Sequence, residues 1–355
     1  MPRKRSNLRY GVVAVTGLAG AICATVLATV LVSGVGAAQE PITLKILRPW
    51  PAESKDCTGY REFIKTVNEK GKGKVRLTDV GGSEVFPSGQ QLSVLKGGQV
   101  DLLYTASGYI ASSFPEPTAL MYQFGASPTQ VREAGVIDKL DAIGRETNGV
   151  AFLGIPWWAN AHVWLKKPVS SLDDLKKLKI RSHPGYDPVI KGLGVPTVNV
   201  SFSDLYTALD RGVIDGLAFP YFDIKTYGLE KVIRYRLDPP FWRAGWVMLL
   251  ANARKLDSLP ADVRNLIFDA MLEIEKNAPS IYDALAEEES KELATAGVKS
   301  TRLSEEEWRA AQRVAWEEGL PKTLLKVSEK YGKEVVDMMG RFYPPKAPFK
   351  AVGLQ

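Results

Sequence analysis

Cysteine and histidine are almost absent from this chain of 355 residues, since each occurs only twice. Cys23 lies in an apolar N-terminal run, which leaves Cys57 as the only cysteine in the rest of the chain, so no disulfide is expected there. No His-Glu-x-x-His pattern and no closely spaced cysteine pair occurs, so the sequence has no signature of a bound metal or cofactor. The fold must therefore be held together by packing.

Signatures of catalysis are missing as well. The sequence contains no Gly-x-Ser-x-Gly and no Gly-rich phosphate loop followed by Lys-Ser or Lys-Thr. His162 lies in an apolar strand and is expected in the core or at a cleft edge. His183 either bonds a ligand or shapes a turn, and neither histidine has the partners of a triad. A binding protein is therefore expected rather than an enzyme.

The first 38 residues differ from the rest of the chain. Four basic residues precede the apolar run 11–32, and Gly36, Ala37 and Ala38 follow it, which is the order of a secretory signal peptide cleaved after Ala38. An uncleaved membrane anchor is the alternative. Cleavage would reduce the formal net charge from +6 to about +2 and leave lysines scattered among acids, so nucleic-acid binding is not expected.

One short pattern occurs twice. Leu95, Gly98 and Asp101 are spaced as Leu209, Gly212 and Asp215 are, and each set reads as a helix end, a turn glycine and the start of a buried strand. The repeat and the alternation of strand-like and helix-like runs predict two similar α/β lobes. The predicted strands are 42–47, 75–80, 100–105, 150–155 and 246–251, and the predicted helices are 59–69, 88–96, 128–147, 260–296 and 322–342.

The chain is expected to cross between the lobes twice. We assign residues 39–158 and about 245–285 to the first lobe, residues 159–244 and about 286–343 to the second, and residues 344–355 to a tail. The crossing after Trp157 and Trp158 is a candidate hinge, and the long helix beyond Pro260 would span both lobes. The predicted architecture is a two-lobed α/β clam-shell.

Arg181 is the strongest candidate for a functional residue. It ends a short strand, and the residues after it, from Ser182 to Gly185, favour a loop. In open α/β sheets ligands bind at the carboxyl ends of strands, and a guanidinium can hold a carboxylate with two parallel hydrogen bonds. Arg181 is therefore predicted to capture a carboxylate.

The segment around Arg181 resembles the solute-binding receptors of TRAP transporters. Residues 175–181 resemble Leu-Lys-Gly-Leu-Lys-Ile-Arg, and residues 202–216 resemble Phe-Ser-Glu-x-Tyr-x-Ala-Leu-x-x-Gly-x-x-Asp-Gly, with weaker similarity over most of the chain after residue 40. The resemblance implies a type II-like periplasmic binding protein in which Arg181 pairs with an organic acid that is passed to TRAP membrane subunits. A receptor that presents its ligand to a sensor protein and a periplasmic enzyme acting on a carboxylate remain alternatives.

Departures from the family pattern suggest the kind of acid. Where relatives place a second arginine this chain has Ala161, and where they place an asparagine it has Phe219. Fewer polar partners favour a monocarboxylate with an apolar or aromatic body. The predicted ligand-binding residues besides Arg181 are Phe219, Trp158, Trp157, Asn160, Trp50, Glu84, Ser107, Tyr109, His183 and Trp242.

Overall fold

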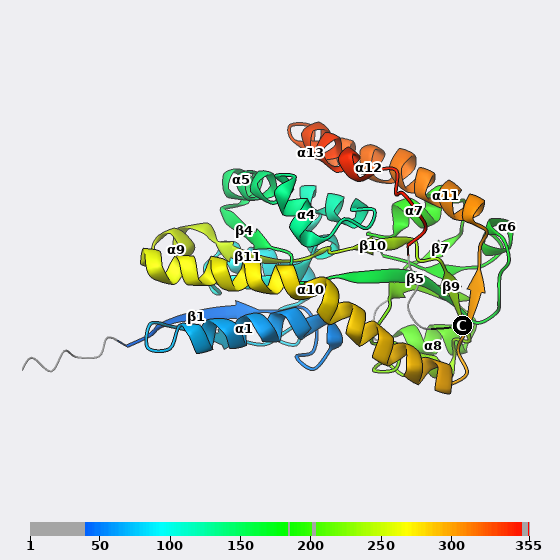
Figure 1. Ribbon diagram of the computed structural model, residues 1–355, viewed down its shortest axis with the longest axis horizontal. Helices are drawn as coiled ribbons and strands as arrows, with labels where there is room; N and C mark the ends of the chain where they lie inside the picture. The colour runs from blue at the N-terminus through cyan, green and yellow to red at the C-terminus, as the bar shows by residue number, and fades with distance from the viewer. Residues whose placement is uncertain (1–39, 184, 201–203, 350–353, 355) are drawn as a thin grey trace, which may run out of the picture. The chain divides into compact units, whose positions relative to one another are not determined.

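The computed structural model describes residues 40–183, 185–200, 204–349 and 354 (Figure 1). The predicted signal peptide or anchor lies outside these residues, as do positions 201–203 of the family motif and most of the last six residues. In the described part of the chain, no helix has the length and apolarity that a membrane span requires.

Helices and strands alternate along the chain. The strands are β1 (Ile42–Leu47), β2 (Val75–Asp79), β3 (Leu102–Ala106), β4 (Val150–Gly154), β5 (Ala159–Leu165), β6 (Ile180–Arg181), β7 (Thr197–Val198), β8 (Gly216–Pro220), β9 (Tyr235–Asp238), β10 (Trp242–Ala244), β11 (Val247–Asn252) and β12 (Lys299–Arg302). The α-helices are α1 (Thr58–Lys70), α2 (Gln91–Lys96), α3 (Ser107–Ile110), α4 (Pro128–Glu133), α5 (Val136–Asn148), α6 (Leu172–Leu175), α7 (Asp187–Gly192), α8 (Leu205–Asp210), α9 (Ala253–Asp257), α10 (Ala261–Thr295), α11 (Glu305–Val314), α12 (Leu320–Val327) and α13 (Gly332–Met339).

The strands form two sheets of the same construction. The first has the order β2-β1-β3-β11-β4, and the second contains the order β7-β6-β8-β5-β9, extended by β12 and with β10 beside β5. In each sheet three parallel strands are followed by an antiparallel one, β11 or β5. All residues of β4, β8 and β11 are buried, as expected for strands covered on both faces. We call these the first and second sheet.

The sequence repeat has the same geometry in both sheets. Gly98 and Gly212 both have φ of 71°, which a glycine adopts without strain. The Asp101 carboxylate accepts the Lys45 backbone N–H at 2.8 Å, and the Asp215 carboxylate accepts the Lys179 N–H at 2.9 Å. Each aspartate thus holds the edge of the neighbouring parallel strand, β1 or β6.

The chain crosses between the sheets in two adjacent segments. One joins β4 to β5 and the other joins β10 to β11. A Cβ on Gly245 in the second segment would lie 2.4 Å from the Trp157 carbonyl oxygen in the first, so only glycine fits there. Gln123 bonds both the N–H and the carbonyl of Gly245 at 3.2 and 2.6 Å. This pair of segments lies where the hinge was predicted, but the predicted lobe boundaries stay a prediction.

Helix α10 runs past both sheets and forms hydrogen bonds with residues near each of them (Figure 1). Its Glu275 accepts the Ile155 N–H at 2.9 Å, just after β4, and its Glu289 accepts the Asp223 N–H at 2.8 Å, just after β8. With bounds Ala261–Thr295, α10 matches the helix predicted over 260–296 almost residue for residue.

Two other predicted helices are broken. The helix predicted over 128–147 is α4 and α5, because Gly135 between them has φ of 78°. The helix predicted over 322–342 is α12 and α13, because the chain leaves the helical conformation at Ser328, with φ of −136°. Apolar periodicity continued through both breaks and so concealed them.

Candidate ligand-binding site

Arg181 lies at the carboxyl end of β6, between β7 and β8, at the position predicted from the sequence. Only 7% of the residue is exposed, and its Nε donates to the Val200 carbonyl oxygen at 3.3 Å. No carboxylate among the described residues lies within 4.0 Å of its guanidinium. Burial lowers the pKa of Arg181 from its ordinary value, yet a guanidinium remains charged in proteins. The site therefore contains a buried positive charge that has no counter-ion among the described residues.

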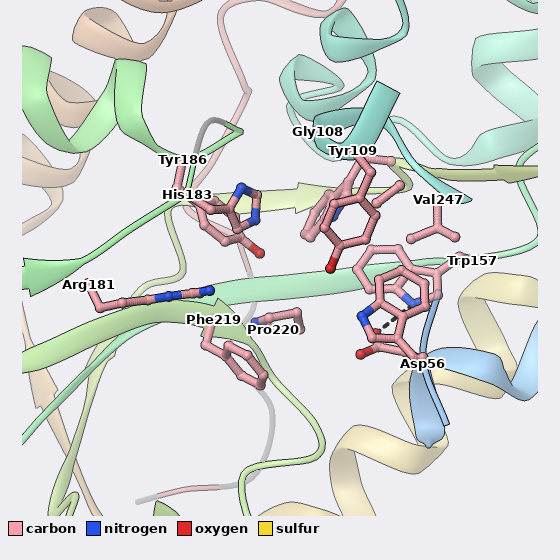
Figure 2. A pocket seen from close by; sticks show the side chains of 13 residues that line it. Asp56, Gly108, Tyr109, Trp157, Arg181, His183, Tyr186, Phe219, Pro220 and Val247 are labelled. Carbon is pink, nitrogen blue, oxygen red and sulfur yellow. Dashed lines mark hydrogen bonds between the residues drawn. The ribbon is translucent and has the colours of Figure 1, made fainter. Parts of the chain in front are cut away.

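This guanidinium faces a pocket of about 590 Å³, counting space open to solvent (Figure 2). The lining residues are Trp50, Asp56, Ala106, Gly108, Tyr109, Trp157, Arg181, His183, Tyr186, Phe219, Pro220, Trp246 and Val247. They come from both sheets and from both crossing segments. A largely apolar pocket with a few polar groups is typical of a small-molecule site.

Aromatic rings form much of the wall. The rings of Trp157 and Trp246, one on each crossing segment, are 4.4 Å apart, and Tyr186 lies 5.9 Å from Trp246. The Tyr186 hydroxyl is buried and has no hydrogen-bond partner among the described residues. Burial raises the pKa of Tyr186 well above its ordinary value, so the hydroxyl keeps its proton. It is an unused donor beside the guanidinium.

His183 both shapes a turn and lines the pocket. Its Nδ1 accepts the Gly185 N–H at 2.9 Å, which orders the loop after Arg181. Burial and the adjacent charge of Arg181 lower the pKa of His183 to about 3, so the ring is neutral at physiological pH. The structure thus accommodates both roles considered from the sequence.

The structure brings six of the predicted residues together. Trp50, Tyr109, Trp157, Arg181, His183 and Phe219 all line the pocket. Five others do not: Trp158, Asn160, Trp242, Ser107 and Glu84. Which of the six bind a ligand stays a prediction.

The five outlying residues have other surroundings. The Trp158 ring lies against the Arg243 guanidinium, 5.4 Å from its centre, and Asn160 accepts from Arg243 at 3.0 Å. Trp242 packs on Tyr186, with ring centres 4.6 Å apart, behind the lining. Two further residues complete the set. Ser107 is fully buried beside the lining residue Gly108, and the Glu84 side chain is 62% exposed and 3.8 Å from Arg48.

Sequence reasoning missed seven of the lining residues, and three of these, Asp56, Tyr186 and Trp246, bring a carboxyl group, a hydroxyl and an indole to the pocket. Trp246 was taken as the first residue of a strand, but the strand begins at Val247 and leaves the indole at its end. Asp56 lies in a short 3-10 helix, Lys55–Cys57, well after β1. No pattern in the sequence marks it as facing Arg181. Among the described residues, no group of three His, Cys, Asp or Glu side chains could hold a metal ion.

Comparison with known proteins agrees with this geometry. Residues 48–322 match the model of the family "Bacterial extracellular solute-binding protein, family 7". A monocarboxylate 2-oxoacid-binding periplasmic protein of Nostoc sp. is 28% identical over 80% of each chain. The C4-dicarboxylate-binding periplasmic protein DctP of Rhodobacter capsulatus is 26% identical over 86% of this chain and 92% of its own.

The fold is also that of solved receptors. The structure of a TRAP periplasmic solute-binding protein from Desulfovibrio salexigens, with bound orotic acid, superposes with a TM-score of 0.74 at 18% identity, over 85% of this chain and 98% of that one. The predicted two-lobed α/β architecture is therefore confirmed, and so is the expectation of a receptor rather than an enzyme. The chain belongs to family 7 of the bacterial extracellular solute-binding proteins, the solute receptors of TRAP transporters.

Proposed function

We propose that this protein is a periplasmic receptor that binds a monocarboxylate with an apolar or aromatic body and delivers it to TRAP membrane subunits. One observation carries the proposal: Arg181 is buried in the wall of the pocket with no carboxylate of the described residues beside it. A ligand carboxylate would supply the missing charge and two parallel hydrogen bonds. The unpartnered Tyr186 hydroxyl offers the same carboxylate, or a neighbouring oxygen, a further donor.

The rest of the lining supports an apolar body. Trp50, Trp157, Trp246 and Phe219 present rings to the pocket, and Pro220 and Val247 add aliphatic surface. The two relatives named above bind organic acids by their descriptions, a 2-oxoacid and a C4-dicarboxylate. A second arginine for a second carboxylate is not among the lining residues. This favours one carboxylate per ligand in the present chain.

The test is the binding of the acid that co-purifies with the protein, identified by native mass spectrometry and measured by calorimetry. Arg181→Ala should weaken its binding by about 30-fold or more, because the loss of a partner from a buried charge pair costs roughly 2–5 kcal/mol. Arg181→Lys should also bind poorly, because an ammonium does not reproduce the fork. Arg309→Ala, at an exposed ion pair with Glu305 on α11, is the control and should bind as wild type. Undiminished binding by Arg181→Ala would refute the proposal.

A further inference from the structure

Asp56 is the one acidic side chain in the lining of the pocket. Figure 2 shows it on the opposite side of the pocket from Arg181, with Tyr109 and Tyr186 between them (Figure 2). The hydroxyls of Tyr109 and Tyr186 each interact electrostatically with both Asp56 and Arg181, which agrees with this placement. Asp56 is 4% exposed, so its carboxyl group faces the pocket rather than bulk water.

The Asp56 carboxyl group has few partners. Its Oδ1 accepts the Trp157 indole N–H at 3.1 Å, and its Oδ2 receives no hydrogen bond from any described residue. The nearby hydroxyls of Tyr104 and Tyr282 do not bond the carboxyl group. They donate to the Asp56 backbone carbonyl oxygen, at 2.6 and 3.4 Å. The thiol of Cys57 keeps its proton, because burial raises the pKa of that group. One carboxylate oxygen therefore remains for a ligand.

The groups behind Asp56 make this side of the pocket negative. Asp223 receives hydrogen bonds from Ser54 Oγ at 2.6 Å and from the backbone N–H of Asp56 at 3.3 Å. The Lys55 ammonium, which lies next to Asp56 in the sequence, pairs with Glu289 at 2.8 Å and is therefore already bound. Burial, and then the charges of Asp223 and Glu289, raise the pKa of Asp56 well above its ordinary value. A cation that enters the pocket would offset the cost of ionising Asp56 beside these negative charges.

The pocket is therefore electrically polar: as far as the described residues go, the Arg181 guanidinium on one side and the Asp56 carboxyl group on the other both lack an oppositely charged partner. We propose that the ligand is a zwitterion whose carboxylate meets Arg181 and whose protonated amine, on the far side of an apolar body, meets Asp56. The inference rests on the proposed function and narrows its substrate class to acids with a distant amine. Such a ligand pairs with the Arg181 guanidinium and favours the carboxylate form of Asp56 at once, which a plain acid does not.

The test compares two acids of similar size that differ in the amine, 4-(aminomethyl)benzoate and 4-ethylbenzoate, by calorimetry. Wild type should bind 4-(aminomethyl)benzoate at least about 10-fold more tightly than 4-ethylbenzoate. Asp56→Asn should reduce this ratio of affinities to about 3-fold or less. Asparagine keeps the acceptor for Trp157, so the loss reports the charge. Asp262→Asn, at an exposed pair with Lys74, is the matched control and should preserve the ratio.

Proton release provides a second readout that a structural role of Asp56 would not change. If Asp56 is protonated in the empty pocket, an arriving ammonium displaces that proton to the buffer. Calorimetry in buffers of different ionisation enthalpy should then show release of up to about one proton for the amine with wild type and none with Asp56→Asn.

The two proposals fail in different ways. A ratio near unity in wild type, or a ratio that Asp56→Asn preserves, overturns the zwitterion inference and leaves the carboxylate receptor in place. Equal binding of 4-ethylbenzoate by wild type and Arg181→Ala overturns the proposed binding of a carboxylate by Arg181. If wild type binds neither compound at millimolar concentration, the co-purified ligand decides after treatment with an amine-labelling reagent, and an acid that takes up no label overturns the inference.

Discussion

Arg48 and Arg181 lie at the carboxyl ends of matching strands in the two sheets, one register position apart, and have opposite surroundings. Arg48 comes directly after β1 and Arg181 is the last residue of β6, the two strands bonded by the repeated aspartates, and each residue is 7% exposed. Arg48 donates to Asp79 at 3.0 Å and to the Trp50 carbonyl oxygen at 2.6 Å. Within the described part of the chain, Arg181 has a single side-chain hydrogen bond, to the Val200 carbonyl oxygen.

The pKa shifts of the two arginines follow this difference. Burial alone would lower the pKa of Arg48, but the hydrogen bond and charge of Asp79 outweigh burial and raise it. Burial lowers the pKa of Arg181, which has no such partner. Two arginines with equal burial can thus serve as a structural ion pair or as an unfilled anion site, and only the neighbouring strand decides which.

The largest effect expected at neutral pH is on stability. Arg48→Met should lower the free energy of unfolding by about 1–3 kcal/mol, because it strands Asp79 and the Trp50 carbonyl without a partner. Arg181→Met should change it by less than about 0.5 kcal/mol or raise it, because no protein charge loses its counter-ion. Urea unfolding of ligand-free protein measures both. Equal losses for the two variants would remove the distinction drawn between these arginines.

A carboxylate placed beside Arg181 should convert it into a second Arg48. Val198 on β7 is the register partner of Arg181, so Val198→Asp brings an acid to the same face of the sheet. It should weaken binding of the natural acid by about 10-fold, because the guanidinium is then already paired. Val198→Asn is the uncharged control. Titration calorimetry that shows equal weakening by both variants would attribute the effect to packing rather than to charge.

His183 should make the stability of the protein sensitive to acid. Its folded pKa of about 3 lies below the unfolded value near 6.5, so the unfolded chain takes up a proton first. The associated stability is therefore present above pH 6.5 and is lost as the pH falls toward 3, with a slope of at most about 1.4 kcal/mol per pH unit. His183→Asn should flatten the pH dependence of the unfolding free energy in this window. An unchanged slope would show that the ring is better solvated than its surroundings imply.

The smallest effect tests the repeat. Gly98→Ala and Gly212→Ala should each cost about 1 kcal/mol of unfolding free energy, because both glycines have φ of 71°. The cost should be equal at the two sites, since a Cβ would meet nothing closer than 4.0 Å at either one. Thermal and urea unfolding of the single and double variants would reveal any inequality, which would mean that the two turns differ in the unfolded chain.

The fold could be predicted from local patterns, and the site only in part. The repeat around Asp101 and Asp215 and the apolar runs of β4 and β11 are written in neighbouring residues, so the sequence shows them directly. The position of Arg181 in the pocket wall could be predicted because the strand end and the family motif around it are also local properties. The breaks at Gly135 and Ser328 were missed because the apolar periodicity continues through them.

The rest of the site depends on long-range placement. Asp56 faces the pocket because its short helix is held by Asp223, a residue 167 positions away along the chain. The sequence also could not distinguish Trp157 from Trp158, since neighbouring side chains in extended backbone point to opposite sides and the side that faces the ligand is set by packing. Aromatic content predicted the character of the wall but not its members.

The close pair of Trp157 and Trp246 gives the crossing an optical signature. One indole stands on each crossing segment, and the two ring centres are 4.4 Å apart where Gly245 lets the backbones meet. Indoles at this separation couple their excited states, so the near-ultraviolet circular dichroism depends on the angle between them. A change in the angle between the two crossing segments should therefore be measurable from the circular dichroism of the unlabelled protein.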